Sequence, residues 1–186
     1  KACRFKLLDE AAEAICAYVL AEPTGDGQRC SVDAVTLELT KPAALGDIAM
    51  PSVRVYREAS EYCPEVETQD FGRVDIIAEG KGFGIYRLRI APGAAIKTHV
   101  HRVMCEHELV LGDGLLLQNK PVGAGWAHCW PLNFPHRYDN PTDQEQTILC
   151  VDKPPFIPDD EVAVDEPLGD LKEAAPEFYY PLESVT

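Results

Sequence analysis

The stretch KTHVHRVMCEHELVLGDG, residues 97–114, decides how this sequence is interpreted. It holds three of the chain's five histidines, and two of them, His99 and His101, are separated by a single residue. Alternate side chains of a β-strand lie on the same face of the strand. Two imidazoles at this spacing can therefore point at one common atom, which raises the question of a metal ion and its other ligands.

The composition of the chain limits the kinds of partner it can have. Its 186 residues favour one domain with an appendage, and a hydrophobic content of 46% is enough for a core. The formal net charge of -14 repels a nucleic acid backbone and anionic lipid. No apolar run approaches the roughly 18 residues that a membrane-spanning helix needs. We therefore expect a small-molecule ligand, with neither nucleic acid nor membrane as a partner.

The seven cysteines are scattered, odd in number, and include no C-x-x-C pair. This pattern argues against a disulfide framework and against a zinc knuckle. Free thiols suit a reducing compartment, so a cytoplasmic location is expected, with most cysteines acting as small buried apolar residues. No G-x-S-x-G occurs either, which leaves an acyl-transfer hydrolase without support.

Changes in residue composition and pattern divide the chain into three parts. Residues 1–71 form an N-terminal extension, in which 7–22 suit a helix, 31–40 a strand and 41–52 a loop. Residues 72–152 are short β-prone runs punctuated by Gly, Pro, Asn and Asp, which is typical of an antiparallel sandwich or barrel. Residues 153–186 read as an extended, acidic and Pro-rich tail that wraps the body, with a helical turn near 171–175 and aromatic anchors.

Two motifs inside the β-rich part identify a family. Gly93 is followed by five residues, His99, one residue, His101, four residues and Glu106. Downstream, Gly125 is followed by five residues and Pro131, and the segment continues through His136 to Asn140. This pair of motifs resembles that of the cupin superfamily over about half of the chain. The resemblance implies an all-β fold, a cupin-like jelly-roll barrel with an N-terminal α/β extension and the C-terminal tail.

The two motifs depart from the cupin pattern at two glycine positions. The first has Asp113 where a glycine is expected, flanked by Gly112 and Gly114, so a shifted turn can restore the geometry. The second has Asn133 in place of glycine, and Asn tolerates a left-handed backbone better than most residues. Neither departure removes a candidate ligand.

The resemblance implies one divalent transition metal inside the barrel, held by His99, His101, Glu106 and His136. Three imidazoles and a carboxylate suit Fe, Mn, Ni, Zn or Cu and leave positions open for water or substrate. Glu108 is an alternative to Glu106 as the carboxylate ligand, because the two share a strand face. If Glu106 points inward, His107 points away from the metal.

Three further residues are candidates for catalysis by strand alternation. Lys97, two residues before His99, faces the same cavity or reaches the rim. Tyr138, two residues after His136, is an inward-facing donor. His128 is either a hydrogen-bonded core residue or, if it faces inward, an acid or base.

Two classes of function remain open. The first is a metal-dependent cupin enzyme that acts on a small oxygen-containing molecule, as a dioxygenase or as a lyase or isomerase through a metal-bound enolate. The second is a non-catalytic barrel that binds or senses a small molecule or sugar. Exposed sheet edges and the strand-like N-terminal part also predict that residues 1–71 extend or cover a sheet, and that the chain forms a homodimer.

Overall fold

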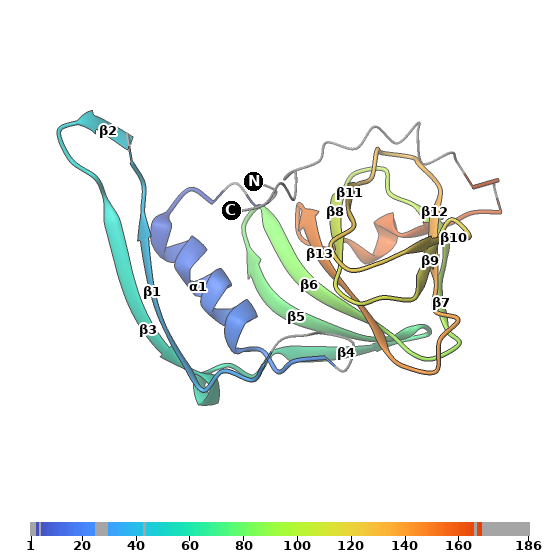
Figure 1. Ribbon diagram of the computed structural model, residues 1–186. Helices are drawn as coiled ribbons and strands as arrows, with labels where there is room; N and C mark the ends of the chain where they lie inside the picture. The colour runs from blue at the N-terminus through green and yellow to red at the C-terminus, as the bar shows by residue number, and fades with distance from the viewer. Residues whose placement is uncertain (1–2, 4, 25–29, 43, 166, 169–186) are drawn as a thin grey trace.

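The body of the protein is built from two antiparallel sheets (Figure 1). The computed structural model describes residues 3, 5–24, 30–42, 44–165 and 167–168. The larger sheet has the strand order β11-β8-β13-β6-β5-β4, and the smaller has the order β10-β9-β12-β7-β14. The larger sheet contains β4 (Glu65–Gln69), β5 (Gly72–Gly80), β6 (Phe83–Ile90), β8 (Cys105–Val110), β11 (Ala127–Cys129) and β13 (Gln146–Lys153). The smaller contains β7 (Ala95–Val100), β9 (Leu115–Leu117), β10 (Lys120–Val122), β12 (His136–Asp139) and β14 (Val162–Ala163).

The main hydrophobic core lies between these two sheets. Ile90 and Ile148 of the larger sheet and Leu117 of the smaller are completely buried in one apolar cluster. Alternation along each strand sends every second side chain into this layer, so short strands suffice to enclose it. The predicted all-β jelly roll is confirmed, although among the described strands hydrogen bonding does not close the two sheets into one continuous barrel.

The N-terminal part supplies a helix and a two-stranded ribbon. The helix α1 (Leu8–Leu20) follows the prediction for residues 7–22, and its buried small residues include Ala14 and Ala17. They pack on Ile77 and Phe83 of the larger sheet. The helix also contacts the ribbon of β1 (Ala34–Thr40) and β3 (Ser52–Glu58), so it lies between the ribbon and β5 (Figure 1). A short strand, β2 (Ala44–Asp47), occupies part of the predicted loop, and the 3-10 turn η1 (Ala59–Glu61) follows β3.

The first part of the chain both covers and extends the larger sheet, as predicted. The helix α1 covers the outer face of β5 and β6, and β4 pairs with β5 along the edge. The sheet thus begins at residue 65, before residue 72, where the sequence pattern had placed the start of the β-rich part. The homodimer stays a prediction.

The described part of the C-terminal tail adds a strand to the edge of the smaller sheet. After the 3-10 turn η2 (Pro158–Asp160), strand β14 pairs with β7. The Asp160 carboxylate accepts backbone N–H groups of Arg102, Val103 and Met104, and therefore fixes the turn between β7 and β8. The predicted helical turn and most of the aromatic anchors lie outside the described residues.

Two turns show how the departures from the cupin pattern are accommodated. Asn133 adopts φ 61°, the left-handed conformation predicted for it. In the other motif Gly114 has φ 131°, while the Asp113 carboxylate accepts the backbone N–H of Ala124 at 2.9 Å. The turn has shifted by one residue, and the aspartate ties it to the next loop. In the part of the chain that the structure describes, no helix is long and apolar enough to cross a membrane.

Candidate metal centre

Four buried side chains from the two motifs converge between the sheets. They are His99 on β7, His101 just after it, Glu106 on β8 and His136 on β12. Each offers a ligand atom, and these atoms all lie within 4.8 Å of one another. One oxygen, Oε2 of Glu106, is 3.0 Å from Nε2 of His101 and 3.1 Å from Nε2 of His136.

Strand register brings these residues together. His99 on β7 is paired with His136 on β12, and their ring centroids are 4.1 Å apart. Glu106 reaches the same point from the facing sheet, where it is paired with Asp152 of β13. Residues some 37 positions apart in sequence become neighbours only because β7 and β12 are adjacent. The four residues that the motifs single out thus form one group.

The hydrogen bonds of the imidazoles prepare them as ligands. Nδ1 of His99 lies 2.8 Å from the carbonyl oxygen of Lys97, and Nδ1 of His136 lies 3.0 Å from that of Phe134. A carbonyl oxygen only accepts, so both Nδ1 atoms donate, and in a neutral ring Nε2 is left with a lone pair. Nε2 of a neutral His136 would face Glu106 acceptor to acceptor, and a cation between the two atoms would satisfy both. A transition metal fits this donor set.

The protonation states of His99 and Glu106 also suit a metal. Burial, together with the charge of His136, lowers the pKa of His99 to about 4, so this imidazole is neutral at neutral pH. Burial by itself raises the pKa of Glu106, but His101 and His136 outweigh it and hold that pKa well below its usual range. A neutral imidazole and an ionised carboxylate are the forms that coordinate a metal.

Glu106 and Glu108 have different surroundings. Glu108 does not join the histidines, because Trp130 and the Tyr138 hydroxyl both donate to its Oε2, the latter at 2.6 Å. Burial and then the charge of Glu106 raise the pKa of Glu108 well above its usual value. The structure therefore places Glu106 in the ligand group and Glu108 beside it as a second carboxyl group, with a raised pKa that favours its protonated form.

Tyr138 faces inward, as alternation predicted. It is fully buried in the core, and its hydroxyl group donates a hydrogen bond to Glu108. Burial raises its pKa well above the usual value, which keeps the phenol protonated as a donor.

The expectation that Lys97 faces the cavity is wrong. Its side chain is 75% exposed, and Nζ lies 3.0 Å from Oδ2 of Asp70. The cause is a β-bulge in β7. Ile96 is opposite Tyr138 and His99 is opposite His136, so three steps along β7 match two along β12. The extra residue breaks the two-residue alternation between Lys97 and His99.

His128 is a buried residue outside the ligand group. It lies opposite Glu108 on β11 with its ring centroid 4.2 Å from that of Trp130. Neither ring nitrogen has a hydrogen-bond partner among the described residues, so the expectation of a hydrogen-bonded core histidine is wrong. Burial, with the charge of His136, lowers its pKa to about 4.

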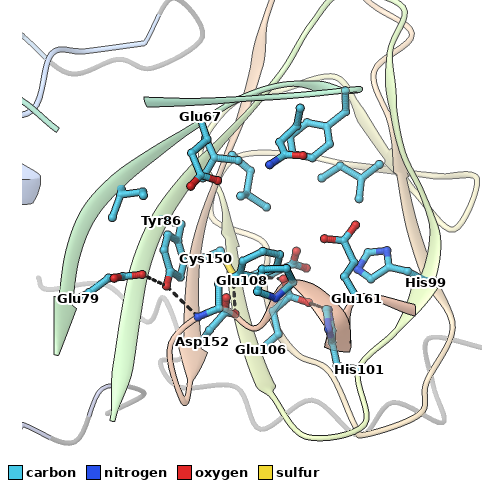
Figure 2. Close-up of a pocket in the computed structure, with 18 of the residues that line it drawn as sticks. Glu67, Glu79, Tyr86, His99, His101, Glu106, Glu108, Cys150, Asp152 and Glu161 are labelled. Atoms are coloured by element: carbon cyan, nitrogen blue, oxygen red, sulfur yellow. Dashed lines mark hydrogen bonds and ion pairs between the residues drawn. The ribbon is translucent and has the colours of Figure 1, made fainter. Parts of the chain in front are cut away.

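A cavity of about 630 Å³ opens beside the ligand group (Figure 2). His99, His101 and Glu106 line it, and carboxylates from several strands and from the tail point into it. These acidic residues are Glu65, Glu67, Glu79, Glu106, Glu108, Asp152 and Glu161. Among the described residues no lysine or arginine lines the cavity, so its wall is strongly acidic.

Sequence reasoning missed most of this acidic wall. Glu65 and Glu67 come from β4, and Glu161 comes from the tail, in segments with no motif. Asp152 is paired with Glu106 across β13 and β8, a relation that depends on strand register. Burial and the charge of Glu106 raise the pKa of Asp152 to about 8. No spacing signal in the sequence connects these residues to the histidines.

Two motifs, distant in sequence, thus deliver four ligand-type side chains to one point between the sheets of a jelly roll. The chain has the fold of a cupin.

Known structures similar to this one include cupins. A protein from Planctomyces limnophilus is 25% identical, over 53% of this chain and 89% of its own, with a TM-score of 0.44. A sugar phosphate isomerase of the cupin superfamily from Silicibacter pomeroyi is 26% identical over 44% and 58%, with a TM-score of 0.40. The polyketide cyclase RemF from Streptomyces resistomycificus is 22% identical over 53% and 84%, with a TM-score of 0.41. No protein-family model matches the sequence, and the search of curated proteins gave no match.

Proposed function

We propose that this protein is a metal-dependent cupin enzyme that acts on a small oxygen-containing molecule. The observation that carries the proposal is the group of His99, His101, Glu106 and His136 on the wall of a cavity of about 630 Å³. These four side chains would hold one divalent transition metal. Such an ion, when bound, polarises a substrate oxygen and stabilises developing negative charge.

The wall of the cavity supports a neutral or cationic substrate. Glu65, Glu67 and Glu79 line the cavity, and among the described lining residues no lysine or arginine offsets their charge, so the wall disfavours phosphates and polycarboxylates. A small hydroxycarbonyl compound or polyol carries oxygen atoms that can bind at the ion without adding negative charge. The volume of the cavity is in the range of small-molecule sites.

The position of Glu108 supports proton transfer as the reaction. This carboxyl group lines the cavity, two residues from Glu106, and Tyr138 and Trp130 fix its orientation through one oxygen. A carboxyl group held there can give a proton to, or take one from, a substrate carbon beside a carbonyl group. An isomerase or lyase therefore fits this wall better than a dioxygenase.

A deuterium-exchange experiment tests the proposal. Protein stripped of metal and reloaded with Mn²⁺, Ni²⁺, Zn²⁺ or Fe²⁺ is incubated in D₂O with a panel of uncharged hydroxycarbonyl compounds. Metal-dependent exchange at a carbon next to the carbonyl, seen by NMR, is expected. Glu108→Gln should abolish this exchange, and Lys97→Ala, the exposed control, should not.

Two other outcomes would redirect the assignment. Oxygen consumption by the iron-loaded protein, without any exchange, would favour a dioxygenase. Failure to bind any of the four metals would leave the non-catalytic barrel as the better description.

A further inference from the structure

The outer face of β8 carries a second group of potential ligands. Cys105 and His107 alternate with Glu106 and Glu108, so they point away from the cavity. Cys129 of the neighbouring strand β11 joins them. Its Sγ lies 3.8 Å from Sγ of Cys105, and Nε2 of His107 lies 3.6 Å from the first sulfur and 4.0 Å from the second. Both cysteines are half-buried.

The size of this triangle matches a tetrahedral zinc site. Zinc binds thiolate sulfur at about 2.3 Å and imidazole nitrogen at about 2.0–2.1 Å. Tetrahedral angles then place two sulfurs about 3.8 Å apart and each sulfur about 3.6 Å from the nitrogen. The Sγ–Sγ separation of 3.8 Å and the shorter Sγ–Nε2 separation of 3.6 Å agree with these values, and the longer one is within half an ångström.

A disulfide explains the two cysteines less well. Cys129 is paired with His107, so Cys105 lies diagonally across the two strands. Diagonal partners on an antiparallel pair are about 7–8 Å apart at Cα, whereas a disulfide needs about 4.4–6.8 Å. Bridging them would require the strands to shift, but a metal ion fits between them as they stand.

We propose that Cys105, His107 and Cys129 form a second metal site, on the outside of the barrel, that binds a thiophilic divalent ion such as Zn²⁺. As each zinc–sulfur bond forms, an S–H bond breaks and its proton passes to water. Among the described residues no fourth Cys, His, Asp or Glu joins the group, so water or an external ligand completes the tetrahedron. The site is independent of the function proposed for the cavity, because it uses the opposite face of β8.

Metal titration of the reduced protein tests the proposal. We expect wild-type protein to bind about two Zn²⁺ ions per chain and the Cys105→Ser, Cys129→Ser double variant about one. With Co²⁺ as the probe, the outer site should give a thiolate-to-cobalt charge-transfer band in the near ultraviolet. This band should disappear in the double variant and persist in His136→Ala, which removes a ligand of the inner group.

Two control variants separate the outer thiols from the others. Cys150→Ser removes the buried thiol that lies 3.3 Å from Glu106, and Cys63→Ser removes an exposed thiol. Both should keep the charge-transfer band. A band that survives in the double variant, or that disappears with Cys150→Ser, overturns the proposal.

A measurement on wild-type protein avoids any question of variant folding. Reduced protein is alkylated with and without Zn²⁺, and each cysteine is followed by peptide mass spectrometry. Zinc should slow the alkylation of Cys105 and Cys129 by at least about 10-fold and leave exposed Cys30 and Cys63 unchanged. Equal protection of all four cysteines, or of none, contradicts the site.

Discussion

The two faces of β8 differ in the chemistry they present. The inward face carries Glu106 and Glu108, both buried among imidazoles and aromatic side chains. The outward face carries Cys105 and His107 and meets Cys129 of β11. The neighbouring strand β11 repeats the alternation, with His128 opposite Glu108 and Cys129 opposite His107.

The difference shows how much a single short strand can specify. The inner group offers nitrogen and oxygen atoms, which suit Mn, Fe or Ni, while the outer group offers sulfur and nitrogen, which suit zinc or copper. Strand β8 contributes Glu106 to the inner group and Cys105 and His107 to the outer group, because the side-chain period of a strand is two. Variants of one face should therefore leave the other face intact, and the following predictions are arranged around that separation.

The largest effect is expected for His136→Ala, tested in the Cys105→Ser, Cys129→Ser background so that only the inner group is measured. Loss of a direct ligand should weaken metal binding by more than the roughly 10–100-fold that outer-shell losses cost. Isothermal titration with Mn²⁺ or Ni²⁺ measures the change. His128→Ala in the same background is the matched control and should keep its affinity. If the two variants exchange these results, His128 and not His136 is the ligand.

The next effect separates the two inward carboxyl groups. Glu106→Gln replaces the charged oxygen that faces His101 and His136 with a neutral amide oxygen, so metal affinity should fall by at least the roughly 10–100-fold of an outer-shell loss. Glu108→Gln keeps an acceptor oxygen for Tyr138 and Trp130, so affinity should change less than about threefold and stability by about 1 kcal/mol. Titration and urea unfolding measure these quantities. Equal losses in both variants would mean that the carboxyl groups act as one unit.

A pH effect is expected at His128 in the metal-free protein. Its pKa falls from 6.5 to about 4 on folding, so the unfolded chain binds the proton first as the pH drops. Stability is therefore complete above pH 6.5 and is lost as the pH falls towards 4. Between pH 7 and pH 5 this residue should account for about 2 kcal/mol of the loss.

Urea unfolding at the two pH values checks this prediction. His128→Gln should lose less stability than wild type over the interval, and the difference between the two losses isolates His128 from His99, whose pKa is lowered in the same direction. Equal losses in the two proteins would show that His128 gains a proton in the folded state as easily as in the unfolded one.

The smallest effect is expected for Lys97→Ala. The ion pair of Lys97 with Asp70 is exposed on both sides, and such pairs contribute about 0–1 kcal/mol. Metal affinity of the inner group and stability should both stay close to wild type in the titration and urea measurements above. A large loss of metal affinity would mean that the bulge in β7 straightens and turns Lys97 inward.

The sequence by itself determined the fold class and the four residues of the inner group. The spacing of His99, His101 and Glu106 is local, so a strand and a turn of ordinary geometry deliver them together. The second motif adds His136, and Asn133 supplies the left-handed turn that precedes it. The features within each motif could be predicted because they depend on residues a few positions apart, and the family resemblance implied that the two motifs meet.

Only the tertiary structure decided which other side chains meet them. The bulge in β7 turned Lys97 outward, although alternation had placed it inward, because an irregularity in pairing leaves no mark in spacing. The acidic wall combines β4, β13 and the tail, and the outer group pairs Cys105 with Cys129. Those contacts depend on which strands are neighbours and in what register. Register results from packing of the whole core and cannot be obtained from any one segment.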